Sequence, residues 1–328
     1  MKIEHRRNEE DQGPTMTIKP RKIFAGIATL ALATSTMACA QTQEHPTPVA
    51  STQAPASDVE LGAPALWRVA DDDTTIYVFG TVHALPDDID WYSGPVKTAL
   101  DSSETLVTEI DMSPAALANV PAIVQQTAIL PEGTTLRSLM TDDQRATYEA
   151  ALAKLGIQPG ALDRFEPWFA TLQISQIAFA AAGFTGENGT EKVLDRTVGD
   201  RVGRDALETI EMQLAIFDEL PQDAQIDYLV ETAEGVDQIG PMLQTMIDEW
   251  ADGDVDDLGA ILNEAFKADP VLANRLLYSR NANWATWIDD RLDQPGTIFM
   301  AVGAGHMAGD QKLQDKLAER GIKMVRIQ

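Results

Sequence analysis

Short runs of β-branched and aromatic residues predict the strands of a sheet in the first third of the chain. The runs Ala65–Ala70 and Thr74–Phe79 flank three consecutive aspartates, which are a turn signal, so they predict a β-hairpin. A further run, Thr105–Ile110, follows a predicted helix at Pro95–Ser102. This strand–helix–strand order predicts a right-handed βαβ unit in which Thr105–Ile110 lies parallel to Thr74–Phe79 as its neighbour.

The C-terminal part of the chain repeats this order. A strand, a glycine-rich loop, a helix stopped by a glycine and a final strand are predicted, in turn, at Thr297–Val302, Gly303–Gly309, Asp310–Arg320 and Ile322–Ile327. We therefore expect a second βαβ unit. If both units join one sheet in parallel, the carboxyl ends of their strands meet at one edge.

The chain between the two units carries apolar residues at helical spacing, punctuated by prolines. The segments that predict helices are Pro114–Ile129, Thr141–Leu155, Pro167–Ala182, Glu191–Val202, Met212–Glu219, Asp223–Ala233, Gln238–Trp250, Val255–Lys267 and Val271–Leu292. Asp205–Thr209 fits either a short strand or the start of a helix. The predicted fold class is therefore α/β, with a central, mostly parallel sheet built from the N- and C-terminal βαβ units and a large helical middle.

Residues 1–40 are predicted to be a signal peptide. A basic cluster that begins at Lys19 precedes the apolar segment Ile23–Ala33, and small residues follow it. Acidic residues ahead of the basic cluster fit this pattern badly, so translation is expected to start at Met16. Residues 41–60 are rich in Gln, Thr, Pro, Ala and Ser and predict a flexible linker, which leaves residues 61–328 as the folded domain.

Two processing routes remain open for the signal peptide. The sequence Ala38-Cys39-Ala40 suits ordinary cleavage after Ala40, whereas Met37-Ala38-Cys39 partly resembles a lipoprotein box with Cys39 as the lipidated residue. The protein is therefore expected to be exported, either into the periplasm or to a membrane to which a lipid on Cys39 anchors it.

The net charge of −26 narrows the expected partners. A chain with this negative charge is repelled by nucleic acid and by anionic membrane surfaces. We therefore expect no nucleic-acid partner and no membrane contact apart from a lipid anchor. Cys39 is the only cysteine, which excludes a disulfide within the chain and a cysteine-rich metal site.

The histidines of the predicted domain both follow a strand and a glycine. His83 lies in Gly80-Thr81-Val82-His83, and His306 lies in Gly303-Ala304-Gly305-His306. Glu109 lies near the end of the strand expected beside the first motif, in an apolar context where an unpaired charge would be costly. Two imidazoles and a carboxylate form a common divalent-metal set, so these residues are candidate ligands. Buried structural histidines and an exposed edge glutamate are the alternative.

Other polar residues are candidates for supporting roles. Arg280 and Asn281 lie in a predicted helix with apolar flanks, and Arg280 could pair with a site carboxylate or orient a substrate anion. Glu208 and Gln213 could be partners of the site or simply helix surface. The tryptophans of the same helix as Arg280 are expected to belong to the core.

Two other chemistries do not fit the spacing. The glycines at 303, 305 and 309 form GxGxxxG, which is one residue too long for a dinucleotide-binding loop. No GxSxG motif occurs, so a serine nucleophile in an elbow turn is not expected.

With these residues in view, the sequence resembles the TraB/GumN family, also called the TraB/PrgY/GumN group. The matching blocks, in order, are ALWRV…TTIYVFGTVHALP, TLVTEID, ALETIEMQLAIFDELP, SRNANWATWI and FMAVGAGHMAGDQKLQDKLAERGIKMVRI, and together they span about residues 61–328. One departure is Gly189-Thr190-Glu191, where an aspartate is expected shortly after the glycine. We expect that segment to lie away from the proposed site.

The resemblance implies an α/β fold similar to that of erythromycin-esterase and ChaN-like proteins. It also implies a metal-dependent hydrolase, since an animal branch with the same paired Gly-x-x-His motifs is a metalloprotease that clips a secreted signalling protein. By that likeness His83 and His306 would be metal ligands or catalytic, Glu109 a ligand or general base, and Arg280 a site residue.

The function predicted is an exported, metal-dependent hydrolase, most simply a peptidase, that acts on a peptide or small molecule. The ion would be Zn²⁺, Mn²⁺ or Co²⁺, held by His83, His306 and Glu109, with Glu109 and Arg280 as catalytic residues and Asn281 and Glu208 beside them. A non-catalytic binding or regulatory protein and a metal-independent hydrolase with a histidine base remain as alternatives. The oligomeric state stays open.

Overall fold

A computed structural model of the protein describes residues 62–87, 89–267 and 269–328. The predicted signal peptide, the linker and Cys39 lie outside the described residues. Within the described part of the chain, no helix is long and apolar enough to cross a membrane.

Six strands of the described chain form one sheet in the order β4-β3-β5-β2-β1-β6. Their bounds are β1 Leu66–Ala70, β2 Thr74–Thr81, β3 Thr105–Ile110, β4 Gly203–Glu208, β5 Gly296–Gly303 and β6 Val325–Arg326. Strands β4, β3, β5 and β2 run parallel, whereas β1 pairs antiparallel with both β2 and β6. The predicted α/β class with a mostly parallel sheet is confirmed, and so is the β1–β2 hairpin.

The neighbours within the sheet differ from those predicted. β5 lies between β2 and β3, with Thr75 opposite Thr297 and Leu106 opposite Phe299, so β2 and β3 are not adjacent. The prediction was wrong because it followed chain order. The central position of a sheet suits the strand that is buried on both faces, and β5 is buried over all its residues from 298 to 303.

The C-terminal βαβ unit also differs from the prediction. β6 is a short, exposed strand that pairs with β1 at the far edge of the sheet, so it does not form a pair with β5. Asp205–Thr209, for which a strand or a helix start was expected, belongs largely to strand β4.

Thirteen α-helices are assigned in the described residues. Their bounds are α1 Gly94–Asp101, α2 Pro114–Leu117, α3 Val120–Thr127, α4 Asp142–Lys154, α5 Pro167–Ala181, α6 Thr190–Val198, α7 Ile210–Asp218, α8 Gln222–Glu234, α9 Ile239–Asp252, α10 Val255–Phe266, α11 Pro270–Ala273, α12 Ser279–Leu292 and α13 Leu313–Glu319. The predicted helical middle is thus confirmed, with one predicted segment divided into α2 and α3.

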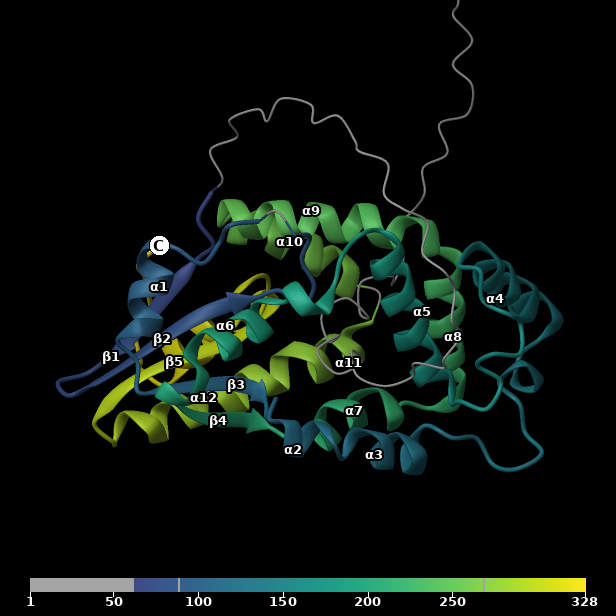
Figure 1. The fold of residues 1–328 in the computed structure, drawn as a ribbon, viewed down its shortest axis with the longest axis horizontal. Helices are drawn as coiled ribbons and strands as arrows, with labels where there is room; N and C mark the ends of the chain where they lie inside the picture. The colour runs from purple at the N-terminus through teal and green to yellow at the C-terminus, as the bar shows by residue number, and fades with distance from the viewer. Residues whose placement is uncertain (1–61, 88, 268) are drawn as a thin grey trace, which may run out of the picture.

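Alternate residues of the sheet face two hydrophobic cores, as the two-residue period of a strand requires. Along β5, Phe299 and Ala301 join a large core shared with α1 and the helical middle. Ile298, Met300 and Val302 face the opposite side and pack with α12 and α13. The arrowheads of β2, β3 and β4 in Figure 1 point toward the helical middle, so the carboxyl ends of these strands meet the helices.

The predicted helix Val271–Leu292 is one helical path with a change in winding. α11 continues through a π-helical segment, Asn274–Tyr278, directly into α12. Single π-helical turns are rare and occur frequently at functional sites. This one immediately precedes Arg280.

Candidate functional site

The candidate residues meet where the parallel strands end. His83 follows β2, Glu109 is the penultimate residue of β3, and His306 lies in a 3₁₀ turn after β5. The side chains of all three residues lie around Gly303, the last residue of β5. A side-chain carbon placed there would lie 3.2 Å from Oε1 of Glu109, 3.7 Å from Cδ2 of His306 and 3.9 Å from Nε2 of His83. The absence of a side chain at Gly303 therefore leaves a cradle between the three groups.

Glu109 is buried and every side of its carboxylate is engaged. Oε1 accepts a hydrogen bond from the backbone N–H of Gly303 at 2.7 Å, and Oε2 accepts from Arg280 at 2.6 Å and from Gln213 at 2.8 Å. Burial alone would raise the pKa of this carboxyl. The positive charge of Arg280 and the hydrogen bonds nevertheless hold the pKa far below its usual range, so Glu109 is ionised.

Arg280 joins the two carboxylates of the site. Its guanidinium donates to both oxygens of Glu208, at 2.8 to 3.1 Å, and to Glu109. Its Nη1 donates to the carbonyl of Leu276 in the π-helical segment at 2.9 Å and lies 3.2 Å from Nε2 of His306. The indole of Trp284 lies beneath the guanidinium, with its ring centre 4.8 Å away. Such contacts explain how a charged side chain can be buried here.

Hydrogen bonds determine which nitrogen of His306 carries the proton. The amide nitrogen of Asn281 donates to the carbonyl of Gln311 at 2.9 Å, so its Oδ1 is the atom that faces Nδ1 of His306 at 2.6 Å. Nδ1 must therefore donate, which leaves the lone pair of Nε2 facing Arg280 and Glu109. Burial, followed by the positive charge of Arg280, lowers the pKa of His306 well below its usual value, so the ring is neutral.

His83 is held by a different partner. Its Nδ1 lies 2.5 Å from Oε1 of Glu191, and both side chains are about 10% exposed. Burial would lower the pKa of His83, but the negative charge of Glu191 outweighs it and raises the pKa to about 9. The same pairing lowers the pKa of Glu191, although burial alone would raise it. Nε2 of His83 is left facing the cradle at Gly303.

Sequence reasoning placed Glu191 away from the site, and this is wrong. The segment that begins at Gly189 crosses directly over the end of β2: Thr190 accepts a hydrogen bond from the N–H of Val82 at 3.0 Å. A side-chain carbon on Gly189 would lie only 2.2 Å from the carbonyl oxygen of His83, so only glycine permits this approach. The departure from the family pattern at Glu191 was the available signal, because an acidic residue was expected in this segment.

A small apolar pocket borders the two histidines. Its volume is about 60 Å³, and its walls come from the ends of β2 and β5, from α5, α9 and α10, and from the π-helical segment. The lining residues are Thr81, Val82, His83, Ala84, Phe179, Leu243, Met246, Trp250, Leu258, Leu262, Leu277, Gly303, Ala304, Gly305 and His306. The strand ends contribute the polar groups, and the helical middle contributes apolar side chains.

A larger cleft of about 660 Å³ lies over the ends of β3 and β4, between α2, α3 and α7. It shares Glu208 with the site but touches neither histidine. We take the smaller pocket as the candidate site, because both histidines of the site line it, and candidate active sites are recognised by perturbed titratable groups rather than by volume.

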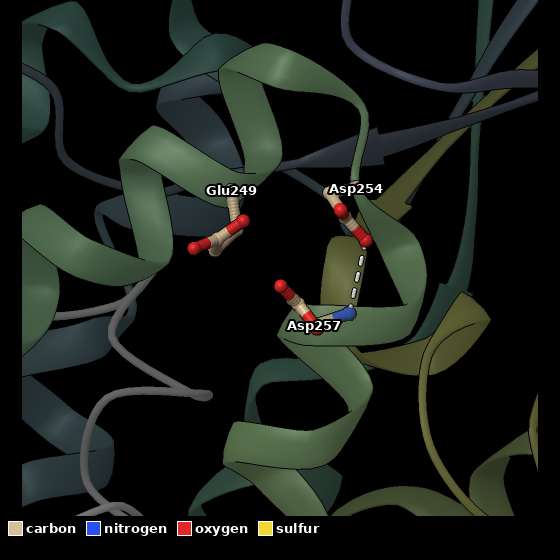
Figure 2. A group of neighbouring side chains, drawn as sticks. All are labelled: Glu249, Asp254 and Asp257. Atoms are coloured by element: carbon tan, nitrogen blue, oxygen red, sulfur yellow. Dashed lines mark hydrogen bonds between the residues drawn. The ribbon is translucent and has the colours of Figure 1, made fainter.

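A separate trio of carboxylates lies at the junction of α9 and α10 (Figure 2): Glu249, Asp254 and Asp257. In the described part of the chain, these are the three side chains of metal-ligating types that lie closest together as a group: one ligand atom from each is within 4.8 Å of the other two. Helix capping explains the position of Asp254, which precedes α10 as its N-cap and accepts a hydrogen bond from the N–H of Asp257 at 3.0 Å. Two of the three side chains are exposed, which is common for acidic groups that bind nothing.

Residues 65–326 match the family model of the TraB/PrgY/gumN family. The chain belongs to this family. A curated relative, an "Uncharacterized protein" of Treponema pallidum (strain Nichols), is 20% identical over 267 residues, which cover 77% of this chain and 80% of the relative. No solved structure matches the chain. Neither the family name nor the name of this relative states an activity.

In this TraB/PrgY/gumN protein, the predicted site residues converge. The structure brings together the residues singled out from sequence, with His83 joining the others at the cradle of Gly303: His83, Glu109, Glu208, Arg280, Asn281 and His306. Gln213, which sequence left as either a partner or helix surface, bonds both Glu109 and Glu208. Trp284 belongs to the core as expected, yet its indole N–H also donates to Glu208 at 2.9 Å and its ring packs against His306.

The donor types suit a divalent cation, but in the described chain the ligand atoms of His83, His306 and Glu109 do not all lie within 4.8 Å of one another, so they would have to close in around an ion. Both imidazoles have Nδ1 fixed by an oxygen, from Glu191 or Asn281, and both direct their other side toward the cradle at Gly303, which is the usual arrangement behind a metal-binding histidine. Nε2 of His306 lies 3.8 Å from Oε1 of Glu109. Arg280 also contacts Nε2 of His306, so this guanidinium would have to move aside when His306 binds an ion.

Proposed function

We propose that the protein is a hydrolase, most simply a peptidase, that uses a divalent cation bound by His83, His306 and Glu109. The observation that supports this proposal is the convergence of two oriented imidazoles and one ionised carboxylate on the cradle at Gly303. Bound there, Zn²⁺, Mn²⁺ or Co²⁺ would lower the pKa of a water molecule and polarise a carbonyl group.

The chain's own residues would supply orientation and charge. Glu191 and Asn281 fix the two imidazole rings, since each holds an Nδ1 atom. Arg280 is the only buried arginine of the described residues, and its positive charge would stabilise the negative charge that develops on the substrate oxygen, although its N–H groups are already held by Glu109, Glu208, His306 and the Leu276 carbonyl. Hydrolysis of an amide breaks the C–N bond and consumes one water molecule, whose hydroxide joins the carbonyl carbon and whose proton joins the departing nitrogen.

A metal-independent hydrolase is the second candidate, and one contact favours it. The nitrogen of His306 that would bind a cation lies 3.2 Å from Nη1 of Arg280. In this arrangement Nε2 of His306 carries no proton and accepts a hydrogen bond from Arg280, which would have to turn toward a substrate oxyanion before the histidine could take up a proton. Such a site could use the histidine as a general base without an ion.

Metal analysis combined with a peptide library separates the candidates. We expect the purified protein to contain a divalent metal, to cleave a subset of peptides, and to lose cleavage on treatment with a chelator. His83→Ala and His306→Ala should each lose both metal and cleavage while staying folded by circular dichroism. His45→Ala is the matched control, because His45 lies in the predicted linker.

Three outcomes would contradict the proposal in different ways. Full metal content and full cleavage in His83→Ala would exclude His83 from the site. Cleavage that survives removal of all metal would support the metal-independent hydrolase. Chelator-insensitive binding of peptides with no cleavage would support a non-catalytic binding protein.

A further inference from the structure

The pocket beside His83 and His306 has two chemically different sides. The strand ends present the imidazoles and backbone groups, whereas the helical middle presents seven side chains that are mainly or wholly apolar: Phe179, Leu243, Met246, Trp250, Leu258, Leu262 and Leu277. Apart from the histidines, no titratable side chain of the described residues lines this pocket. Water in the apolar part would find few hydrogen-bond partners, so an apolar group is the favoured occupant.

The walls of this pocket are held in place. The indole N–H of Trp250 donates to the carbonyl of Gly80 at 2.7 Å, which ties α9 to the end of β2. A side-chain carbon on Gly305 would lie 3.2 Å from Cδ1 of Leu262, so the loop that carries His306 packs tightly on α10. The pocket is therefore a preformed feature of the junction between sheet and helices.

The size of the pocket limits what can enter. Pockets that enclose a whole small ligand measure about 300 to 1,000 Å³, and this one measures about 60 Å³. It has room for a branched group of three or four carbons but not for an aromatic ring. The body of the substrate must then lie outside, with one aliphatic group inserted between the histidines and the helices.

We propose that this pocket binds a small branched aliphatic side chain, of the valine or leucine type, on a residue that flanks the hydrolysed amide bond. The inference rests on the proposed hydrolase function and names its substrate class. Met246 is the wall residue best suited to adjust the fit, because it is only partly buried and its side chain is flexible.

Variants of Met246 test the pocket against a matched control on the same helix. Met242 is also partly buried on α9 but does not line the pocket. The substrates are peptides of equal length that carry Gly, Ala, Val, Leu or Phe on either side of the cleaved bond, and kcat/KM is measured for each. We expect the wild type to prefer Val or Leu over Gly by about tenfold or more, as a hydrophobic pocket allows.

The variants should change this preference in opposite directions. Met246→Phe should shift it toward Ala and Gly, Met246→Ala should admit Phe, and Met242→Phe should keep the wild-type profile. A wild type that prefers Gly, an unchanged profile in Met246→Phe, or an equal shift in Met242→Phe would overturn the proposal.

A binding measurement keeps the pocket testable if no peptide is cleaved. Isobutyramide is titrated into protein with ¹³C-labelled methionine methyl groups, and the Met246 and Met242 resonances are followed. A saturable shift at Met246 alone would support the pocket even if the hydrolase proposal had failed. No shift at Met246 together with no cleavage would overturn the pocket as well.

Discussion

Arg280 is the residue on which the buried charges of the site depend. Its guanidinium contacts Glu109 and Glu208, and all three side chains are less than about a tenth exposed. A buried ion pair contributes little net stability as a whole, but the removal of one partner leaves the others unpaired in a medium of low polarity. The role of Arg280 is therefore measurable apart from any activity.

We predict that Arg280→Met destabilises the protein by about 3 to 5 kcal/mol, because it leaves Glu109 and Glu208 buried without their cation. Urea unfolding followed by circular dichroism measures the change. Arg275→Met is the control: Arg275 forms a largely exposed ion pair with Glu219 at 3.4 Å, so its loss should cost less than about 1 kcal/mol. Equal effects of the two substitutions would contradict the buried-charge interpretation.

The pair of His83 and Glu191 predicts a pH-dependent stability in chelator-treated protein. The pKa of His83 is raised from 6.5 to about 9 in the folded state, so the pair stabilises the fold fully below about pH 6.5 and loses this contribution as pH rises through 9. The loss corresponds to at most about 3 kcal/mol. Urea unfolding at pH 6.5 and pH 9.5 should show this loss in the wild type and a much smaller one in Glu191→Gln. A wild type whose stability does not fall between these pH values would contradict the pairing.

At the scale of elements, the junction between β5 and its following turn shapes the site. Gly303 has φ −49° and ψ 134°, which any residue can adopt, so a side chain there is limited by space and not by the backbone. An added carbon would press on the carboxylate of Glu109 at 3.2 Å and lie at ordinary contact distance from the two imidazoles. The π-helical segment Asn274–Tyr278, where α11 joins α12, also shapes the site. Its Leu276 carbonyl accepts a hydrogen bond from the guanidinium of Arg280 and so holds that side chain in place.

We predict that Gly303→Ala lowers stability by about 1 to 3 kcal/mol and abolishes the proposed hydrolysis, because its methyl group would press on Oε1 of Glu109. Unfolding curves and the peptide assay measure the two effects. Gly160→Ala is the matched control, since its added carbon would meet its nearest atoms at an ordinary 3.5 Å. Wild-type activity in Gly303→Ala would show that the cradle is not needed.

At the scale of the whole molecule, the site lies between two parts built from distant segments of the chain. Five strands of the sheet come from the two ends of the described chain and β4 comes from its middle, and the helical middle covers the carboxyl ends of the parallel strands (Figure 1). Residues as far apart in sequence as Glu109 and Arg280 are thereby in direct contact. Formation of the complete site requires both parts to be folded.

The N-terminal segment leads to a testable prediction that the protein is exported. Expression in a bacterial host with a periplasm, followed by mass spectrometry of the mature protein, should find an N-terminus created within residues 38–41. A lipid-modified Cys39 at the N-terminus would show the lipoprotein route, and a start at Gln41 would show ordinary cleavage. An N-terminus at Met1 or Met16 in the mature protein would contradict export.

The sequence by itself determined much of this protein. Strand and helix positions followed from hydrophobic periodicity, because each strand or helix must bury one face wherever it lies in the fold. The two Gly-x-x-His motifs, Glu109 and Arg280 also stood out, since charged or titratable residues beside apolar runs need partners. The family resemblance, now confirmed, rests on these same residues.

Only the tertiary structure decided which strands are neighbours in the sheet and which side chains are in contact. The insertion of β5 between β2 and β3, the pairing of β6 with β1, and the contact of Glu191 with His83 all join segments that are far apart in the chain. Hydrophobic periodicity shows which face of each strand or helix is buried. It does not show which other element covers that face, because the same apolar face can pack on many partners. The order of strands and the partner of each buried charge are set by the packing of the whole chain, which local sequence does not encode.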